Sequence, residues 1–533
     1  MMHRRFLFGA QNSSSNPVTP VPVPPVPTPP PYPYTEDPQS FRSTQSTIFD
    51  YYGRCVALSS DGTIFVVGSD ETSLNSTVNG TAGPGRVYVY VKSAGIWLPP
   101  QILTAADGVN NDSFGESVAI SADGNTILVG APGAKIGSNA RQGAAYIFSR
   151  QSSGTGVWYQ YKKLTAVDGT QEDQFGHSVA ISADGSTVAV GAIRDDALEG
   201  YNVGSVYTFN VVPTVVVVGS ITGSVLTVSS ITAGTGKLTV GTLITGPGIP
   251  SGVHITQLYS GTIGGIGTYN ISVSLTLPIT GASITGSIDW TQTAKIVASD
   301  CRPDDNFGCS ISMTTTGNYI AIGSYNSDVG IYQNSGAVYY YGRSLSGTVA
   351  TYTQSAKLNA NDITTGQGFG YSIDMNDAGT AMIIGAPFGS PTGSLAEIGS
   401  AYVFTKNVNG WTQRSKIYAS DYAAGDKFGY SVAISSSERF FAVGSPDDDY
   451  TTPTATNEQG SVYVYNNDGT GWVQTAKLIP GDAASGDQFG YSVAMTPDAA
   501  TVAAGAPTKS EPVLSPTVTN TTRIHGAAYI FTQ

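Results

Sequence analysis

Paired carboxylates are the residues of this sequence whose type and spacing could do chemistry. Two carboxylates five residues apart could ligate a cation or act as a general acid and base. A catalytic pair is normally unique, whereas Asp in loops commonly accepts backbone N–H bonds. We therefore interpret these pairs as loop-folding residues, and we predict no catalytic residue, no cofactor-binding residue and no metal ligand. The pairs are Asp107/Asp112, Asp168/Asp173, Asp300/Asp305, Asp421/Asp426 and Asp482/Asp487, with Asp362/Gln367 in a sixth position.

Each pair leads into an aromatic residue followed by glycine, and the same motif occurs once more, without a pair, at Tyr52-Gly53. These glycines are Gly53, Gly115, Gly176, Gly308, Gly370, Gly429 and Gly490, and successive ones are 62, 61, 132, 62, 59 and 61 residues apart. The one long interval is a single period with about 70 extra residues. A period near 60 that recurs seven times is typical of a repeat architecture.

Each repeat predicts four short strands. In the copy that follows Gly115 they are 117–120, 126–130, 143–148 and 158–164, and the turn between the first two carries Asp123-Gly124, a strong hairpin signal. The fourth strand begins with an aromatic residue, such as Trp158 or Trp290, which we expect to pack between neighbouring sheets. Four antiparallel strands in each of seven copies predict an all-β, seven-bladed β-propeller.

The ends of the repeats predict how the ring closes. The last copy ends at Gln533, directly after its third strand, and residues 41–48 provide a spare strand before the first copy. We expect this strand to complete the last blade. The predicted organisation is an N-terminal peptide and Pro-rich linker at 1–39, propeller at 40–210, an inserted β module at 211–287 and propeller at 288–533.

The repeats resemble the FG-GAP family, the propeller of integrin α-subunit heads and of many microbial and viral surface proteins. The resemblance rests on the Phe-Gly pairs and on Gly-Ala-Pro at 130–132, 385–387 and 505–507. It implies a calcium loop of the form Asp-x-Asp-x-Asp-Gly between the first two strands. Here that loop carries one carboxylate at 121–124 and at 182–185, so we predict a variant without calcium, the one cofactor that the family suggests.

The insertion has its own composition. Between Asn210 and Asp289 its only Lys, Arg, His, Asp or Glu residues are Lys237 and His254. The segments 241–250 and 264–269 resemble a Gly/Thr-rich β module of phage and giant-virus structural proteins. This resemblance implies a virion component.

Composition excludes several classes of function. The net charge of −13 and the lack of a basic cluster argue against nucleic-acid binding. No apolar run is long enough for a membrane span, and the start of the chain lacks the apolar core of a signal peptide. Three cysteines are too few for a disulfide framework; a Cys301–Cys309 bridge stays open, although isolated thiols are favoured. His177 occupies a variable position of the repeat, which argues against a metal ligand.

The expected function follows from these exclusions together with what the resemblance of the insertion implies. We expect a non-enzymatic structural or attachment protein on a virion surface, with the Pro-rich segment contacting other virion proteins. Host protein or glycan would bind the long polar loops between second and third strands, at 70–82, 194–202, 447–459 and 508–525. Two alternatives remain: a microbial cell-surface or secreted adhesion protein, and a polysaccharide-acting enzyme that uses the centre of the propeller.

Overall fold

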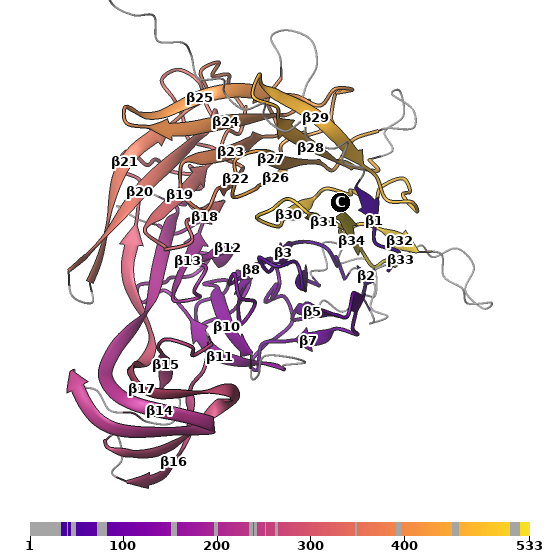
Figure 1. Cartoon of the computed structure of the whole chain (residues 1–533). Coiled ribbons are helices and arrows are strands. Elements are labelled where there is room, and N and C mark those ends of the chain that lie inside the picture. The colour runs from indigo at the N-terminus through magenta and orange to yellow at the C-terminus, as the bar shows by residue number, and fades with distance from the viewer. Residues whose placement is uncertain are drawn as a thin grey trace, which may run out of the picture. The chain divides into compact units, whose positions relative to one another are not determined.

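The structure is a computed structural model, and its regular elements are all β-strands (Figure 1). It describes residues 34–39, 41–43, 50–71, 83–150, 157–196, 201–233, 238, 242–250, 252–261, 265–346, 349–390, 397–449, 458–511 and 523–533. Residues 1–33, which hold most of the predicted N-terminal peptide and linker, lie outside this range. Within it, no helix is long and apolar enough to cross a membrane. The predicted all-β propeller class is confirmed.

The strands form seven sheets of four or more strands, which we call blades and number in chain order. Blade 1 is β3 (Val56–Leu58), β4 (Ile64–Ser69) and β5 (Arg86–Ser93), with β6 (Ile96–Trp97) and β7 (Gln101–Leu103) both on β5. Blade 2 is β8 (Ser117–Ile120), β9 (Thr126–Ala131), β10 (Ala144–Arg150) and β11 (Trp158–Leu164). Blade 3 is β12 (Phe175–Ile181), β13 (Thr187–Ala192), β14 (Ser205–Ala233) and β17 (Gly267–Ile296).

The remaining blades follow the same order. Blade 4 is β18 (Ile311–Met313), β19 (Tyr319–Ser324), β20 (Ala337–Ser346) and β21 (Val349–Leu358). Blade 5 is β22 (Ser372–Met375), β23 (Ala381–Ala386), β24 (Ser400–Asn407) and β25 (Gly410–Ile417). Blade 6 is β26 (Ser431–Ile434), β27 (Phe440–Ser445), β28 (Ser461–Asn467) and β29 (Trp472–Leu478). Blade 7 joins β30 (Ser492–Met495), β31 (Thr501–Ala506) and β34 (Ala527–Thr532) to strands from the start of the chain; β32 (Ser510–Glu511) and β33 (Arg523–Ile524) pair separately.

The blades form a closed ring around their first strands. Each first strand contacts the next, from β3 through β8, β12, β18, β22 and β26 to β30, and β30 contacts β3. Second strands such as β9 are buried along their whole length, because each is covered by a neighbouring blade on both faces. The apolar core is therefore divided into clusters between successive blades, each built from the alternating side chains of two sheets.

The Phe-Gly motif forms the junction between blades. Phe114 is fully buried, and Gly115 adopts a φ of 96°, which favours glycine. The Ser117 hydroxyl donates to the carbonyl of Gly176 in the next blade at 2.8 Å. A Cβ on Gly130 would lie 1.9 Å from that same carbonyl oxygen, so the Gly-Ala-Pro glycine is also required. The same bond joins Ser178 to Gly308, Ser310 to Gly370, Ser372 to Gly429, Ser431 to Gly490 and Ser492 to Gly53, and Cys55 takes the place of serine in blade 1.

The N-terminal segment completes blade 7. β2 (Phe41–Arg42) pairs with β34, as expected for the closing strand, although residues 44–49 lie outside the described range. β1 (Thr35–Glu36) also pairs with β34, within the segment predicted as linker. Pro38 separates the two, since proline cannot donate a ladder hydrogen bond. Phe41 is 1% exposed and contacts the rings of Phe65, Tyr90 and Trp97 in blade 1.

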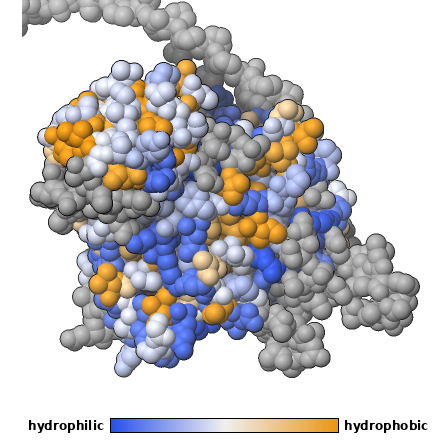
Figure 2. Space-filling model, turned by 90° about the horizontal axis from the view of Figure 1, so that it is seen from below, coloured by the Kyte–Doolittle hydropathy of each residue, from blue (hydrophilic) through white to orange (hydrophobic). Residues whose placement is uncertain are grey.

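The insertion extends blade 3 outward. β14 and β17 pair from Val206 and Ile296 as far as Val228 and Gly267, and β15 (Leu243–Thr245) and β16 (Ile255–Gly261) pair with β17. Its apolar residues form a separate cluster. The strands of the insertion are thus continuous with those of blade 3. The sequence predicted a separate β module and did not predict this continuity. The insertion exposes large hydrophobic side chains, among them Tyr259, Ile266 and Leu277. Figure 2 shows the apolar side chains of this face in several separate groups.

Candidate functional site

The first carboxylate of each repeated pair binds side chains. Asp107 accepts hydrogen bonds from the Tyr146 hydroxyl at 3.1 Å and from the Lys163 ammonium at 2.7 Å. Burial alone would raise the pKa of Asp107, but the bond to Lys163 lowers it. The arrangement ties the connecting loop to the third and fourth strands of its blade. It recurs as Asp300–Tyr339–Lys357, Asp362–Tyr402–Lys416 and Asp421–Tyr463–Lys477, and Asp168 pairs with Lys295. In blade 7, Asp482 binds Tyr529 and Lys509, a lysine that follows the second strand instead of lying in a fourth.

The second carboxylate folds the loop itself. Asp112 accepts the backbone N–H of Val109 at 2.9 Å, and the side-chain oxygen of Gln367 in blade 5 accepts that of Thr364 at 3.1 Å. A neutral amide can do this work, so the position does not require a charge. The interpretation of the pairs as acceptors of backbone N–H bonds therefore holds for this second residue, whereas the first residue accepts from Tyr and Lys side chains. Burial raises the pKa of all five aspartates at this position, including Asp173 and Asp305 to about 6 and Asp426 to about 7.

The first turn of each blade does not fit calcium. The Asp123 carboxylate accepts the Ser121 hydroxyl at 2.6 Å and the backbone N–H of Asn125 at 3.0 Å, so it closes its own turn. Calcium requires six to eight oxygen ligands, and one carboxylate in a tight turn supplies too few. In the described part of the chain, no three His, Cys, Asp or Glu residues lie close enough together to hold a metal ion. The three cysteines are free thiols.

The variable position of Phe-Gly-x-Ser forms a ring at the mouth of the central channel. We call these side chains the axial ring, and in chain order they are Arg54, Glu116, His177, Cys309, Tyr371, Tyr430 and Tyr491. Each lies between a glycine that meets the neighbouring blade and a serine or cysteine that bonds to the next blade. The scaffold therefore fixes where each side chain points. Its chemistry differs between the two halves of the ring.

Blades 1 to 3 contribute the charged half of the axial ring. Arg54 makes an ion pair with Glu116 at 2.6 Å and lies 3.9 Å from Asp70. Although burial by itself would raise the pKa of Glu116, the ion pair with Arg54 lowers it to about 2. Burial lowers the pKa of His177, which outweighs the attraction of Glu116. His177 is thus a neutral imidazole at pH 7.

Blades 5 to 7 contribute the aromatic half. The Tyr371 and Tyr430 rings lie 4.9 Å apart between centroids, and those of Tyr430 and Tyr491 lie 4.8 Å apart. Arg54 joins the halves, since its guanidinium lies 4.9 Å from the centre of the Tyr491 ring. Burial raises the pKa of the Cys309 thiol to about 11, so this cysteine is not a reactive thiolate.

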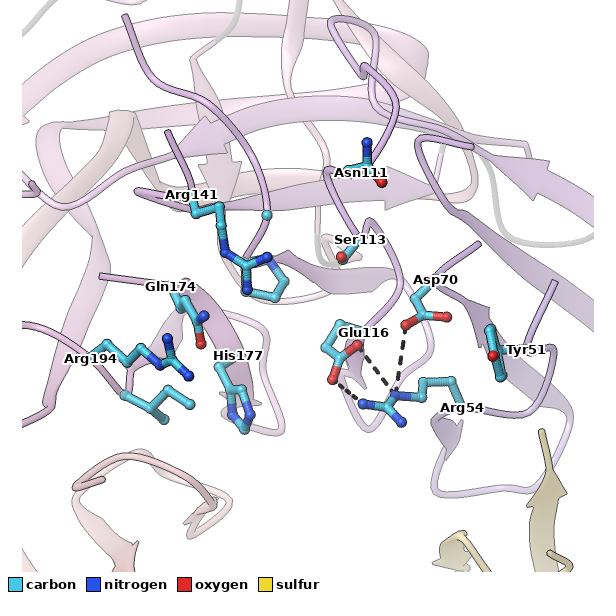
Figure 3. Close-up of a pocket in the computed structure, with 13 residues that line it drawn as sticks. Tyr51, Arg54, Asp70, Asn111, Ser113, Glu116, Arg141, Gln174, His177 and Arg194 are labelled. Atoms are coloured by element: carbon cyan, nitrogen blue, oxygen red, sulfur yellow. Dashed lines mark hydrogen bonds and ion pairs between the residues drawn. The ribbon is translucent and has the colours of Figure 1, made fainter. Parts of the chain in front are cut away.

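A pocket of about 460 Å³ opens over the charged half (Figure 3). Figure 3 shows Arg141, Gln174 and Arg194 on one side and Glu116, Asp70 and Tyr51 on the other, with His177 between them. Arg54, Asn111, Ser113, Pro132, Gly133 and Ile193 complete the lining. Arg194 and Asp70 are the first residues of two of the four predicted binding loops. Across the four loops, most residues lie outside the described part of the chain, namely 72–82, 197–200, 450–457 and 512–522.

The channel below the ring is lined largely by aliphatic residues, but most of the surface that it exposes is polar. It has a volume of about 390 Å³ and is lined by the first strands of all the blades. Asp374 of β22 is the one carboxylate among the described lining residues, at a position where neighbouring blades have small residues such as Ser312 and Ala433. It accepts hydrogen bonds from the Ser312 hydroxyl at 3.2 Å and from the backbone N–H of Ile434 at 2.8 Å. Burial raises its pKa to about 6. These bonds link blades 4, 5 and 6.

Sequence reasoning noted this position at His177 but did not predict a site there. The sequence does carry a signal for this site. Within a motif that otherwise repeats, one position varies among Arg, Glu, His, Cys and Tyr. Which side chains would meet depended on how the blades close, and Arg54 and Tyr491 come from opposite ends of the chain.

Comparison with known proteins agrees with the fold. The FG-GAP repeat model matches residues 97–148, 158–209, 290–341, 352–404, 411–465 and 472–531, more than half of the chain. Among solved structures, the β-propeller domain of Cps50 (Swd1) from Myceliophteria thermophila is similar to 88% of this chain over 96% of its own length, at 11% identity and a TM-score of 0.43. The search of curated proteins finds no match. The chain belongs to the FG-GAP repeat family and folds as a β-propeller.

Proposed function

We propose that this protein is a non-enzymatic, surface-exposed structural and attachment protein that presents the mouth of its propeller to a protein or glycan. The observation that carries the proposal is the pocket over Arg54, Glu116 and His177, where residues that differ from blade to blade meet on a rigid ring. Binding sites commonly lie on variable segments that a fixed scaffold holds in place.

The surface that carries the protein is that of a virion. The resemblance of the Gly/Thr-rich insertion to modules of phage and giant-virus structural proteins supports this assignment. The Pro-rich run from Pro17 to Pro33 acts as the tether to other virion proteins, because such segments adopt extended, semi-rigid conformations. A microbial cell-surface adhesion protein is the competing assignment.

The carboxylates support a binding role over catalysis. Most glycosidases act through a pair of carboxylates that flank the scissile bond. Within the described residues, the channel lining offers Asp374 alone, and Glu116 is held as the ion-pair partner of Arg54. A carboxylate whose pKa is lowered to about 2 is a poor general acid or base at neutral pH.

The test is quantitative mass spectrometry of gradient-purified particles against the soluble and envelope fractions of the source. A constant ratio to capsid proteins is expected. A variant that lacks residues 1–33 should leave the particle fraction while it keeps the melting temperature of the full chain. Recovery of the full chain only in the soluble or envelope fraction would contradict the virion assignment and favour the adhesion protein.

A further inference from the structure

Positive charge is concentrated in the pocket at the mouth of the propeller. The chain has a net charge of −13, yet three of its thirteen arginines, Arg54, Arg141 and Arg194, line this one pocket. Arginine presents a planar set of donors that matches the two oxygens of a carboxylate. A pocket that gathers arginines in an acidic protein favours an anionic ligand.

The three arginines have different roles. Arg54 is committed to the protein, because Glu116, Asp70 and Tyr491 surround its guanidinium. Arg141 uses its Nε to pair with Glu172 at 3.1 Å, which leaves its terminal nitrogens available. Arg194 is exposed, and its side chain has no ion-pair partner among the described residues. Arg141 and Arg194 are therefore the cations that a ligand would meet.

Comparison with other blades shows that Gln174, which lies beside these arginines, lacks a side-chain hydrogen-bond partner in the described part of the chain. In blades 4, 6 and 7 the residue before Phe-Gly pairs with the loop after the second strand: Asn306 with Asn326 at 2.7 Å, Lys427 with Asp447 at 2.7 Å, and Gln488 with Thr508 at 3.2 Å. In blade 3 this residue is Gln174. Its side chain is only 6% exposed, lines the pocket, and forms no hydrogen bond with any described residue.

His177 shows the same deficit at the base of the pocket. Its Nδ1 is buried and has no hydrogen-bond partner within the described part of the protein. Buried polar groups are almost always paired, and leaving one unpaired costs about 1–3 kcal/mol. The buried Nδ1 of His177 and the side-chain amide of Gln174 are thus two polar groups at this pocket for which the described protein supplies no hydrogen-bond partner.

We propose that the pocket binds the carboxylate-bearing unit of an acidic saccharide, with Arg194, Arg141 and Gln174 donating to the carboxylate. This proposal rests on the attachment function proposed above and names its ligand. The opposite wall explains the choice of a sugar acid: Glu116 and Asp70 accept hydrogen bonds from ring hydroxyl groups, which the side chain of an acidic peptide lacks. A volume of about 460 Å³ suits one or two sugar rings.

The test is isothermal titration of the full chain with four probes at fixed salt. They are a disaccharide that ends in glucuronic acid, the same disaccharide with glucose in that place, inorganic sulfate, and a short Glu-containing peptide. The acidic disaccharide should bind at least about tenfold more tightly than each of the others, since a charge-assisted bidentate contact contributes about 1.5–3 kcal/mol.

Variants locate the site. Arg194→Gln should weaken binding of the acidic disaccharide about tenfold, and Gln174→Ala should weaken it several-fold. Arg302→Gln is the matched control, because Arg302 is also exposed but lies outside the pocket, near Asp328 in blade 4. It should leave binding unchanged, and the exposed variants should keep the wild-type melting temperature.

Several results would overturn the proposal: equal affinity for the neutral disaccharide, sulfate that binds as tightly as the sugar acid, tighter binding of the peptide, or full affinity in Arg194→Gln. Failure of the virion assignment is separate. Protein that binds the acidic disaccharide but never sediments with particles keeps this site and loses that assignment. Protein that sediments with particles but does not bind the disaccharide supports the virion assignment and contradicts the proposed saccharide site.

Discussion

The repeated carboxylates between the blades and the axial ring at the mouth of the channel are built from the same repeat but behave in opposite ways. The first carboxylates, such as Asp107 and Asp421, recur with the same tyrosine and lysine partners. The axial ring has one position per blade and changes its side chain from Arg54 to Glu116, His177 and Tyr430. In its charged half, the buried Nδ1 of His177 has no hydrogen-bond partner in the described protein.

The difference separates stability from binding. A structural interaction that works in one blade works in all of them, because the geometry repeats. A ligand is not sevenfold symmetric, so a binding site must differ from blade to blade. Repetition of Asp300 and Asp362 with their partners therefore points to folding, and divergence at His177 points to recognition.

The N-terminal segment that closes the ring is the strongest challenge to the rule that repeated residues serve folding and unique residues serve recognition. Phe41 occurs only once in the repeats and yet has a structural role. Phe41→Ala should lower the free energy of unfolding by about 3–5 kcal/mol, since it empties a site walled by Phe65, Tyr90 and Trp97. Chemical denaturation measures this loss. Val408→Ala, at an exposed apolar residue, should change it by less than about 0.5 kcal/mol. A small loss for Phe41→Ala would mean that the ring does not depend on its closing segment.

Blade 7 tests whether burial sets the strength of the ion pairs between lysine and the aspartates of the connecting loops. Lys509 is 4% exposed and pairs with the buried Asp487 at 2.7 Å, whereas the pair of Lys163 and Asp107 is partly exposed. Lys509→Met should cost about 3 kcal/mol near pH 8, because it removes the cation beside the buried Asp487 carboxylate and leaves it with the backbone N–H of Ala484. Lys163→Met should cost less than about 1 kcal/mol. Equal losses in denaturant melts would contradict this ranking.

The second carboxylates predict a pH dependence. Burial raises the pKa of Asp426 to about 7 in the fold, so the unfolded chain ionises first and stability falls as the pH rises from about 4 to 7. Asp426→Asn should remove this penalty and raise the free energy of unfolding near pH 8 by about 1 kcal/mol. The gain should be small near pH 4, where the folded carboxyl is protonated and the unfolded one is only about half ionised.

Blade 5 already carries a neutral residue at this position and provides the control. Gln367→Glu should lower stability at pH 8 and leave it nearly unchanged at pH 4, the mirror image of the change at Asp426. Denaturant melts at the two pH values measure both variants. If Asp426→Asn destabilises the protein at pH 8, the carboxylate there is needed as a charge and the comparison with Gln367 fails.

The smallest effect is expected from metal removal. Because Asp123 already bonds to Ser121 and Asn125 in its own turn, EDTA should not shift the melting temperature measurably. Added calcium should not shift it either. A fall of several degrees with chelator would show that the first turns hold a cation after all.

The strands were predictable because each carries a local pattern. The predicted strand 117–120 has the bounds of β8, and 158–164 those of β11. The closing role of Phe41 also followed from the missing fourth strand of the last copy. By contrast, the continuity of β14 and β17 with the insertion depends on long-range pairing, which has no local signal. The predicted domain boundaries remain a prediction.

The candidate site was not predictable for the same reason. The contacts of Arg54 with Glu116 and Tyr491 join residues 62 and 437 positions apart. The sequence displays the variable position, but only the closed ring shows that Arg141, Gln174 and Arg194 share a pocket with His177. Alignment of the seven repeats with one another marks the third position of Phe-Gly-x-Ser as variable. It does not show which residues surround that position in the fold.

The most direct test of the account measures stability and binding on the same pair of variants. Asp421→Asn changes a repeated carboxylate, and Arg194→Gln changes the divergent pocket. The account predicts that Asp421→Asn lowers the melting temperature and leaves the affinity for the acidic disaccharide unchanged, and that Arg194→Gln does the opposite. Loss of affinity in Asp421→Asn with full affinity in Arg194→Gln would contradict the separation of stability from binding.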